Sequence, residues 1–245
     1  MFKHRATEPE RIDTGDYTPA EYETFLREIA FINRYLGDGR ALKKTLLRRI
    51  EKEDLKECSV LDVGSGSGEL LQTIAKFMRR RDGKVKLFGI DLNPLSAAAT
   101  HSGVGEFPEI NAIRGDAFEL PFAENTFDFA ISSLFFHHLS DEQTPVVLME
   151  MSRVARRGVF VIDLYRHPLG YLGYKIFCAA FGISPLVKQD GSLSIRKGFR
   201  ERELDKCFAA AGLALEYTKR IAPFRIVAAG HNGRHENSGR SSAAG

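Results

Sequence analysis

A glycine-rich loop between an apolar run and a helical pattern constrains the fold of this chain more than any other feature. The run 60–63 (VLDV) leads into Gly64, Gly66 and Gly68, and a helical pattern then covers 69–80. Glycines allow a tight turn and the close approach of a ligand to the main chain. The free N–H groups at the start of a helix favour a polar or negatively charged group. The segment therefore predicts a strand, a binding loop and a helix.

The spacing of these glycines argues against two classes of nucleotide site. The dinucleotide fingerprint G-x-G-x-x-G needs its third glycine where this chain has Glu69. A phosphate-binding P-loop would continue into Gly-Lys-Ser/Thr, which does not follow here. The loop therefore favours a nucleoside ligand without a pyrophosphate.

Strand-like and helical patterns alternate along the chain after this loop. The alternation predicts βαβ units around a largely parallel sheet, and the nearly continuous apolar strands predict helices on both of its faces. The composition, with 43% apolar and 27% charged residues, is ordinary for a folded domain of this kind. The expected elements are strands over 85–90, 112–115, 127–131, 159–163, 213–221 and 225–229, and helices over 94–101 and 201–211.

The N-terminal region carries a different, wholly helical pattern. Thr18, Pro19 and Glu21 have the spacing of an N-cap and capping box, and they predict a helix over 18–36. Apolar residues at helical spacing predict another helix over 40–53. We interpret this region as a helical cap on the domain that follows.

The segment 165–198 interrupts the alternation of strands and helices. Its stretch 168–187 is strongly apolar, with Lys175 as its only charge. Three glycines and Pro185 argue against a membrane span, so we expect a lid or wall helix over a hydrophobic pocket. The chain then divides into a helical cap (1–57), a core domain (58–230) with a substrate-side insertion (165–198), and a disordered tail (231–245).

Four segments of the core domain resemble the motifs of the class I S-adenosylmethionine-dependent methyltransferases. The glycine loop 62–68 (DVGSGSG) resembles the first motif, and 89–94 (GIDLNP) resembles the end of the second strand. The segment 114–122 resembles the third motif, and 127–139 resembles the fourth strand with its substrate-side turn. Each motif alone is weak, but the order and spacing of the four make the resemblance specific.

The resemblance implies a cofactor and a set of residues that bind it. In this family an acidic residue at the position of Asp91 accepts hydrogen bonds from both ribose hydroxyls, and Leu92 would pack on the adenine. Asp116 would accept a hydrogen bond from the adenine amino group, beside the Ala117 backbone. The implied cofactor is S-adenosylmethionine, and the implied fold is a Rossmann-like, doubly wound α/β sheet of seven strands with one antiparallel strand near its edge. The implied cofactor-binding residues are Asp62, Gly64, Ser65, Gly66, Gly68, Asp91, Leu92, Asp116, Ala117, Ser132 and Ser133.

Methyl transfer requires alignment of the reactants, and a base only where the acceptor starts protonated. His137 and His138 follow the fourth strand, near the expected methyl group, and are the candidate catalytic residues. The alternative is that one of them packs against or caps the next helix. Asp163 either orients a base or merely ends its strand. No metal is expected, because cysteine and histidine lack ligand spacing and Asp163 alone does not gather a set of carboxylates.

The apolar insertion and the helical cap predict an enclosed pocket for a hydrophobic small molecule, such as a phenol, quinol, polyketide or lipid. Within the family, the chain is similar to the small-molecule branch that includes the quinone and polyketide methyltransferases, and it most resembles the enzymes of phenolic-lipid or polyketide pathways. Nucleic acid is not an expected acceptor, because the turn 132–135 (SSLF) lacks the Asn/Asp-Pro-Pro-Tyr pattern of many protein and nucleic-acid nitrogen methyltransferases. The alternatives are an RNA or protein methyltransferase and a catalytically silent cofactor-binding partner subunit.

Charge is unevenly distributed along the chain. The net charge of +3 combines −4 over residues 58–164 with +7 over residues 165–245. A basic excess of this kind would steer the chain toward an anionic lipid surface or an acidic carrier protein. Three widely spaced cysteines and the lack of an apolar signal segment predict a reduced, cytoplasmic location. If the basic region contacts lipid, the protein would lie at the periphery of a membrane. No pattern indicates an oligomeric state.

Overall fold

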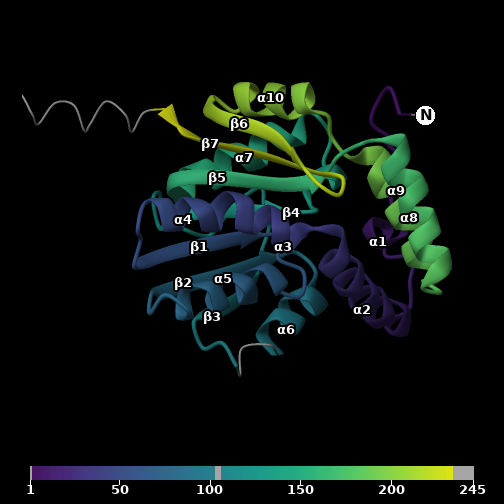
Figure 1. Ribbon diagram of the computed structural model, residues 1–245, viewed down its shortest axis with the longest axis horizontal. Coiled ribbons are helices and arrows are strands. Elements are labelled where there is room, and N and C mark those ends of the chain that lie inside the picture. Colours follow the sequence, from purple (N-terminus) through teal and green to yellow (C-terminus); the bar gives the residue numbers. More distant parts are fainter. Residues whose placement is uncertain (1, 103–105, 234–245) are drawn as a thin grey trace, which may run out of the picture.

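One seven-stranded sheet organises the computed structural model, which describes residues 2–102 and 106–233 (Figure 1). Its strands are β1 (Glu57–Val63), β2 (Lys84–Asp91), β3 (Ile110–Arg114), β4 (Phe127–Ser133), β5 (Ala155–Leu164), β6 (Leu213–Ile221) and β7 (Arg225–Asn232). Their order across the sheet is β3-β2-β1-β4-β5-β7-β6. The first five strands are parallel, and β7 runs antiparallel to both of its neighbours. The predicted α/β fold, doubly wound with one antiparallel strand near the edge, is confirmed.

Side chains of the central strands pack into two hydrophobic cores, one on each face of the sheet. Val60 of β1 and Phe129 of β4 are buried in one core, whereas Leu61 and Ala130, one position further along, are buried in the other. Successive side chains of a strand point to opposite faces, so a strand buried on both faces is apolar at most positions. This is why the sequence of these strands is a nearly continuous apolar run, interrupted by Asp62 in β1 and Asp128 in β4, rather than an alternating one.

Helices cover both faces of the sheet, as Figure 1 shows. They are α5 (Glu69–Arg79), α6 (Pro94–Ser102), α7 (Gln143–Val154) and α10 (Glu201–Ala210). The helices expected over 69–80, 94–101 and 201–211 are confirmed to within a residue at either end. The sequence pattern had not singled out α7, although its Val147, Leu148 and Met151 are fully buried.

The N-terminal region is helical, as expected, but its second helix is not regular. The first long helix is α2 (Pro19–Leu36), and the predicted capping box is present between Thr18 and Glu21. The helix expected over 40–53 is a continuous rod of α3 (Asp38–Leu42), a π-helical turn η1 (Lys43–Leu47) and α4 (Arg48–Lys52). A short helix, α1 (Arg11–Thr14), precedes them and was not expected.

The segment 165–198 forms two helices, α8 (Pro168–Ala180) and α9 (Pro185–Lys197), which pack on each other. No helix in the described part of the chain is both long and apolar enough to cross a membrane. In Figure 1, α2, α8 and α9 lie together beyond one end of the sheet strands. The three cysteines are buried and free.

The expectation of a disordered tail over 231–245 is wrong at its start, because β7 continues to Asn232 and its last residues pair with the beginning of β6. Residues 234–245 lie outside the described part of the chain.

Candidate active site

A cavity of about 1570 Å³ lies where the carboxyl ends of the parallel strands meet α2, α8 and α9. Ligands of doubly wound sheets bind at this end of the strands. Its walls differ in chemistry. One side carries polar residues and glycines of the strand ends, namely Asp62, Gly64, Ser65, Gly66, Asp91 and Ser133. The other side carries apolar residues of the helices, namely Phe25, Ile29, Phe31, Tyr174, Phe177 and Ile195.

The conformation of the glycine loop favours glycine at two positions, by its backbone angle at both and by close packing at Gly64. Gly64 has a φ of 74°, and a Cβ atom there would lie 2.8 Å from Cγ of Phe135. Gly66 has a φ of 54°, and a Cβ atom there would meet nothing within 4 Å. The N–H groups of Gly64 and Ser65 donate to the Ile90 carbonyl oxygen at 2.9 and 3.2 Å. The loop is thereby fixed to the end of β2, with open space beside Gly66.

Asp91 and Leu92 lie at the edge of the cavity, where the resemblance places a ribose and an adenine. The Asp91 carboxylate accepts hydrogen bonds from the N–H groups of Gly66 and Asn93, each at 2.9 Å. Burial raises the pKa of Asp91 above its usual value, and these two N–H groups only partly offset that effect. Each carboxylate oxygen keeps a lone pair for a further donor. Leu92 is exposed beside it and presents an apolar side chain to the cavity.

Asp62 carries the clearest unsatisfied group in the polar wall. It is almost fully buried, and its Oδ1 has no hydrogen-bond partner. Burial, together with the charges of Asp91 and Glu69, raises the pKa of Asp62 well above its usual value. The Oγ of Ser133 is also buried without a partner. A buried polar atom without a hydrogen-bond partner lowers the stability of the fold. A cationic ligand that donates hydrogen bonds to Oδ1 of Asp62 and Oγ of Ser133 would remove that cost.

The structure does not bring every predicted cofactor residue to the cavity. Asp116 is exposed and accepts a hydrogen bond from the Phe118 N–H at 2.9 Å, and neither it nor Ala117 lines the cavity wall. Ser132 is buried and donates to the Val63 carbonyl oxygen at 2.7 Å, which ties β4 to β1. Gly68 caps the start of α5 outside the wall. For these four residues the cofactor role stays a prediction.

His137 is held by a buried carboxylate. It lies in the one-turn helix η3 (Phe136–His138) after β4, and its Nδ1 is 2.8 Å from Oδ1 of Asp163 at the end of β5. The His137 backbone N–H donates to the other oxygen of Asp163 at 3.1 Å. Burial would raise the pKa of Asp163, but His137 and the Leu164 N–H group outweigh it and lower that pKa, so the carboxylate is ionised. A carboxylate beside Nδ1 favours the ring form with a proton on Nδ1, and Nε2 then faces the Glu10 side chain, 4.0 Å away.

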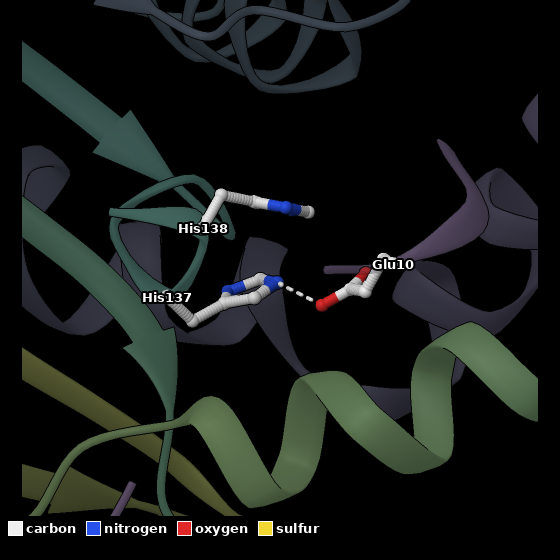
Figure 2. Close-up of side chains that lie close together, drawn as sticks. All are labelled: Glu10, His137 and His138. Atoms are coloured by element: carbon white, nitrogen blue, oxygen red, sulfur yellow. Dashed lines mark ion pairs between the residues drawn. The ribbon is translucent and has the colours of Figure 1, made fainter. Parts of the chain in front are cut away.

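The N-terminal segment brings two carboxylates to these histidines, as Figure 2 shows for Glu10. Oε1 of Glu10 lies 4.0 Å from Nε2 of His137, and Oδ1 of Asp13 lies 2.7 Å from Nδ1 of His138. The two imidazole rings lie 4.2 Å apart between their centroids. No motif in the sequence marks either carboxylate, and more than 120 residues separate them from the histidines.

Glu10, His137 and His138 place three potential metal ligands within 4.8 Å of one another. The ammonium group of Lys197 lies 3.2 Å from Oε1 of Glu10 and 3.3 Å from Oδ2 of Asp13. The chain therefore supplies its own cation to these carboxylates, and we assign no metal to the cluster.

Asp13→Asn is expected to change how the stability of the protein depends on pH. Burial would lower the pKa of His138, but the contact with Asp13 and the charge of Glu10 outweigh it and raise that pKa. Because the pKa of His138 is higher in the folded than in the unfolded state, protonation of His138 stabilises the fold fully below about pH 6.5. This stabilisation is lost as the pH rises through the pKa of His138 in the folded protein. The variant should be less stable by about 1–3 kcal/mol near pH 6. Urea unfolding at a series of pH values measures this.

The matched control is Asp16→Asn, which removes a carboxylate of the same segment that pairs with Arg11 at the surface. This variant should change the free energy of unfolding little, because exposed ion pairs contribute little. The deficit of the Asp13 variant should shrink toward higher pH. A deficit that is the same at every pH would contradict the assignment and point to Lys197 as the group that Asp13 stabilises.

Comparison with known proteins agrees with this geometry. The methyltransferase domain family matches residues 60–158, the segment that supplies the glycine loop and the strand ends. Residues 60–158 are a methyltransferase domain. The strand order of the whole sheet is that of the class I S-adenosylmethionine-dependent methyltransferase fold.

The curated relatives that match the chain include several demethylmenaquinone methyltransferases. The chain is 32% identical over 120 residues to the demethylmenaquinone methyltransferase of Bacillus pumilus (strain SAFR-032), an alignment that covers 49% of this chain and 50% of that protein. The chain thus spans about half the length of the curated relatives it matches.

Solved structures extend the likeness in fold over most of the chain. A S-adenosylmethionine-dependent methyltransferase from Aquifex aeolicus has a TM-score of 0.61 at 18% identity, covering 87% of this chain and 98% of that one. A magnesium protoporphyrin IX methyltransferase from Synechocystis PCC 6803, with bound S-adenosylhomocysteine, has a TM-score of 0.61 at 13% identity, covering 86% and 94%. At these identities the likeness concerns the fold alone.

Proposed function

We propose that this chain transfers the methyl group of S-adenosylmethionine to an ionisable oxygen or carbon of a hydrophobic small molecule, such as a phenol, quinol or polyketide. The observation that carries the proposal is the position of His137. Its imidazole, held by Asp163, lines the cavity together with the polar wall at the strand ends and the apolar wall of the helices. A base placed there can serve an acceptor in the apolar part and a methyl donor in the polar part.

The polar wall fits the proposed cofactor. S-adenosylmethionine carries a ribose diol, an ammonium group and a sulfonium group, and the wall offers the carboxylates of Asp91 and Asp62. The unpartnered Oδ1 of Asp62 and the open space beside Gly66 are the features that a bound ligand would fill. The N–H groups at the start of α5 suit a carboxylate, because a helix N-terminus favours a negative charge.

When bound, the cofactor supplies an activated methyl group, so the protein must align the acceptor and remove its proton. His137 would accept that proton at Nε2, because Nδ1 is engaged by Asp163. Asp163 would hold the ring in this orientation and stabilise the imidazolium that forms. The apolar wall would exclude water from the transfer, which favours a close approach of the reactants.

The turn that presents His137 is itself under conformational constraint. Leu134, directly after β4, has a φ of 53° and lines the cavity. A left-handed conformation at a residue other than glycine costs about 1–3 kcal/mol and is concentrated at functional sites. Its N–H group donates to the Ile162 carbonyl oxygen at 2.9 Å, which keeps the strained residue in place at the end of β4.

The apolar wall supports a hydrophobic acceptor. Ring contacts join α2 and α8, such as Phe31 to Phe177 at 5.9 Å between centroids. Pockets lined by such residues take hydrophobic ligands. The demethylmenaquinone methyltransferases that match half of the chain carry a quinone in their name, so quinols come first among the acceptors to test.

The decisive experiment is turnover of S-adenosylmethionine with a labelled methyl group against quinols, phenols and fatty acids. Isothermal titration with the cofactor alone should detect binding, and label should pass to a hydrophobic acceptor. Binding without transfer to any acceptor would favour the silent partner subunit. Transfer to RNA or protein, with none to small molecules, would overturn the proposed substrate class.

A further inference from the structure

The outer face of α8 exposes an unbroken apolar stripe. Leu169, Leu172 and Ile176 lie three and four residues apart, so they share one side of the helix. Their side chains are 62%, 55% and 61% exposed. A soluble surface helix normally turns its polar side outward. This helix instead keeps apolar residues on the side that faces solvent.

Neighbouring aromatic residues extend this stripe. Phe181, just after α8, and Tyr35, near the end of α2, are both more than half exposed. The Phe31 ring lies 5.5 Å from that of Phe181 and 5.0 Å from that of Tyr35, which joins the two helices. We call this set the α8 surface, which consists of Tyr35, Leu169, Leu172, Ile176 and Phe181.

The exposed charges next to the α8 surface are those of lysines, and the nearby Glu28 of α2 is half-buried and accepts hydrogen bonds from Ser184. Neither 29–36 nor 165–189 contains an acidic residue. Lys175 is exposed on α8 and lies 5.3 Å from the centre of the Tyr171 ring, and Lys188 is exposed on the first turn of α9. Helices that lie in the interface of a bilayer typically carry Tyr and Lys side chains beside an apolar stripe.

The same helix forms a wall of the cavity. Gly170, Gly173, Tyr174 and Phe177 of α8 line the cavity, while the α8 surface residues Leu169, Leu172 and Ile176 do not. Figure 1 shows α8 at the end of the molecule farthest from the loops at the amino ends of the strands. If this protein docked on a partner through α8, its cavity would therefore lie next to that partner.

We propose that the α8 surface docks on the anionic face of a lipid bilayer. Burial of the apolar stripe in the interface supplies the binding energy, and Lys175 and Lys188 favour anionic headgroups. An exposed aromatic and aliphatic face with lysines beside it suits a lipid interface. The docked orientation also gives a hydrophobic acceptor a route from the bilayer into the cavity beside α8, an inference that rests on the proposed function.

Flotation with phosphatidylglycerol-containing vesicles tests the docking without any methyl transfer. The unaltered chain should float with anionic vesicles and less with phosphatidylcholine vesicles. The double variant Leu172→Glu/Ile176→Glu should weaken flotation about 10-fold or more, because two apolar side chains no longer enter the interface. The matched control Val146→Glu/Met149→Glu alters an exposed apolar pair on α7, outside the cavity, and should float like the unaltered chain.

Two further measurements separate this inference from the proposed function. Turnover of a water-soluble acceptor should be equal in the two double variants and the unaltered chain, since none of the four residues lines the cavity. No flotation of the unaltered chain, or equal loss in both double variants, would overturn the docking whatever the catalytic result. Self-association that only the α8 variant abolishes, without vesicle binding, would overturn it in favour of contact with a second copy.

Discussion

His137→Ala is expected to lower kcat for methyl transfer by about 100- to 10,000-fold, the usual contribution of a positioned base. The affinity for S-adenosylmethionine should change little, because no predicted cofactor contact involves His137. Asp163→Asn should also lower kcat, since an asparagine can donate to Nδ1 and so favour the tautomer with the proton on Nε2. Single-turnover rates with the labelled cofactor, together with titration of cofactor binding, measure both effects.

His138→Ala separates the two neighbouring histidines. His138 Nδ1 faces the Asp13 carboxylate, and its ring lies tilted against that of His137, so this variant should lower kcat less than His137→Ala. Added imidazole should restore part of the rate of His137→Ala, because the removed ring leaves space in the cavity wall. An unchanged rate in His137→Ala, or a larger loss in His138→Ala, would contradict the assignment of the base.

Local sequence patterns were sufficient to predict most of the fold. The glycine loop and the Thr18 cap each depend on residues within a few positions, and the structure has them where the patterns place them. The strands lie where they were expected, but β5 begins four residues earlier and β7 ends three residues later than predicted. The π-helical turn after Leu42 could not be read from periodicity. Apolar spacing over 40–53 is similar for an α-helix and for a rod with one wider turn, so only packing distinguishes them.

The candidate site was predicted only in part, because its electrostatics depend on distant segments. The sequence places His137 and Asp163 each at the end of a strand, but their contact follows from the pairing of β4 with β5. Glu10 and Asp13 reach the histidines from the N-terminal segment, which Asp190 of α9 fixes by accepting the N–H groups of Arg11 and Ile12. No local pattern encodes such long-range contacts.

Asp91→Asn is expected to weaken the binding of S-adenosylmethionine by about 10- to 100-fold. Hydrogen bonds to a charged group contribute about 1.5–3 kcal/mol each, and an amide can accept from only one side of the ribose diol. The change is nearly isosteric, so the Gly66 N–H group can still donate to the remaining oxygen. Isothermal titration measures the affinity, and urea unfolding shows whether the loop keeps its contribution to stability.

Asp116→Asn provides the comparison that tells the two acidic residues apart. The resemblance assigns Asp116 to the adenine, whereas the structure leaves it exposed and outside the cavity wall. A loss of affinity in Asp116→Asn as large as in Asp91→Asn would mean that the segment after β3 moves to meet the cofactor. Unchanged affinity in Asp91→Asn would instead remove the ribose assignment and leave Asp91 with the role seen here, which is to fix the glycine loop through Gly66.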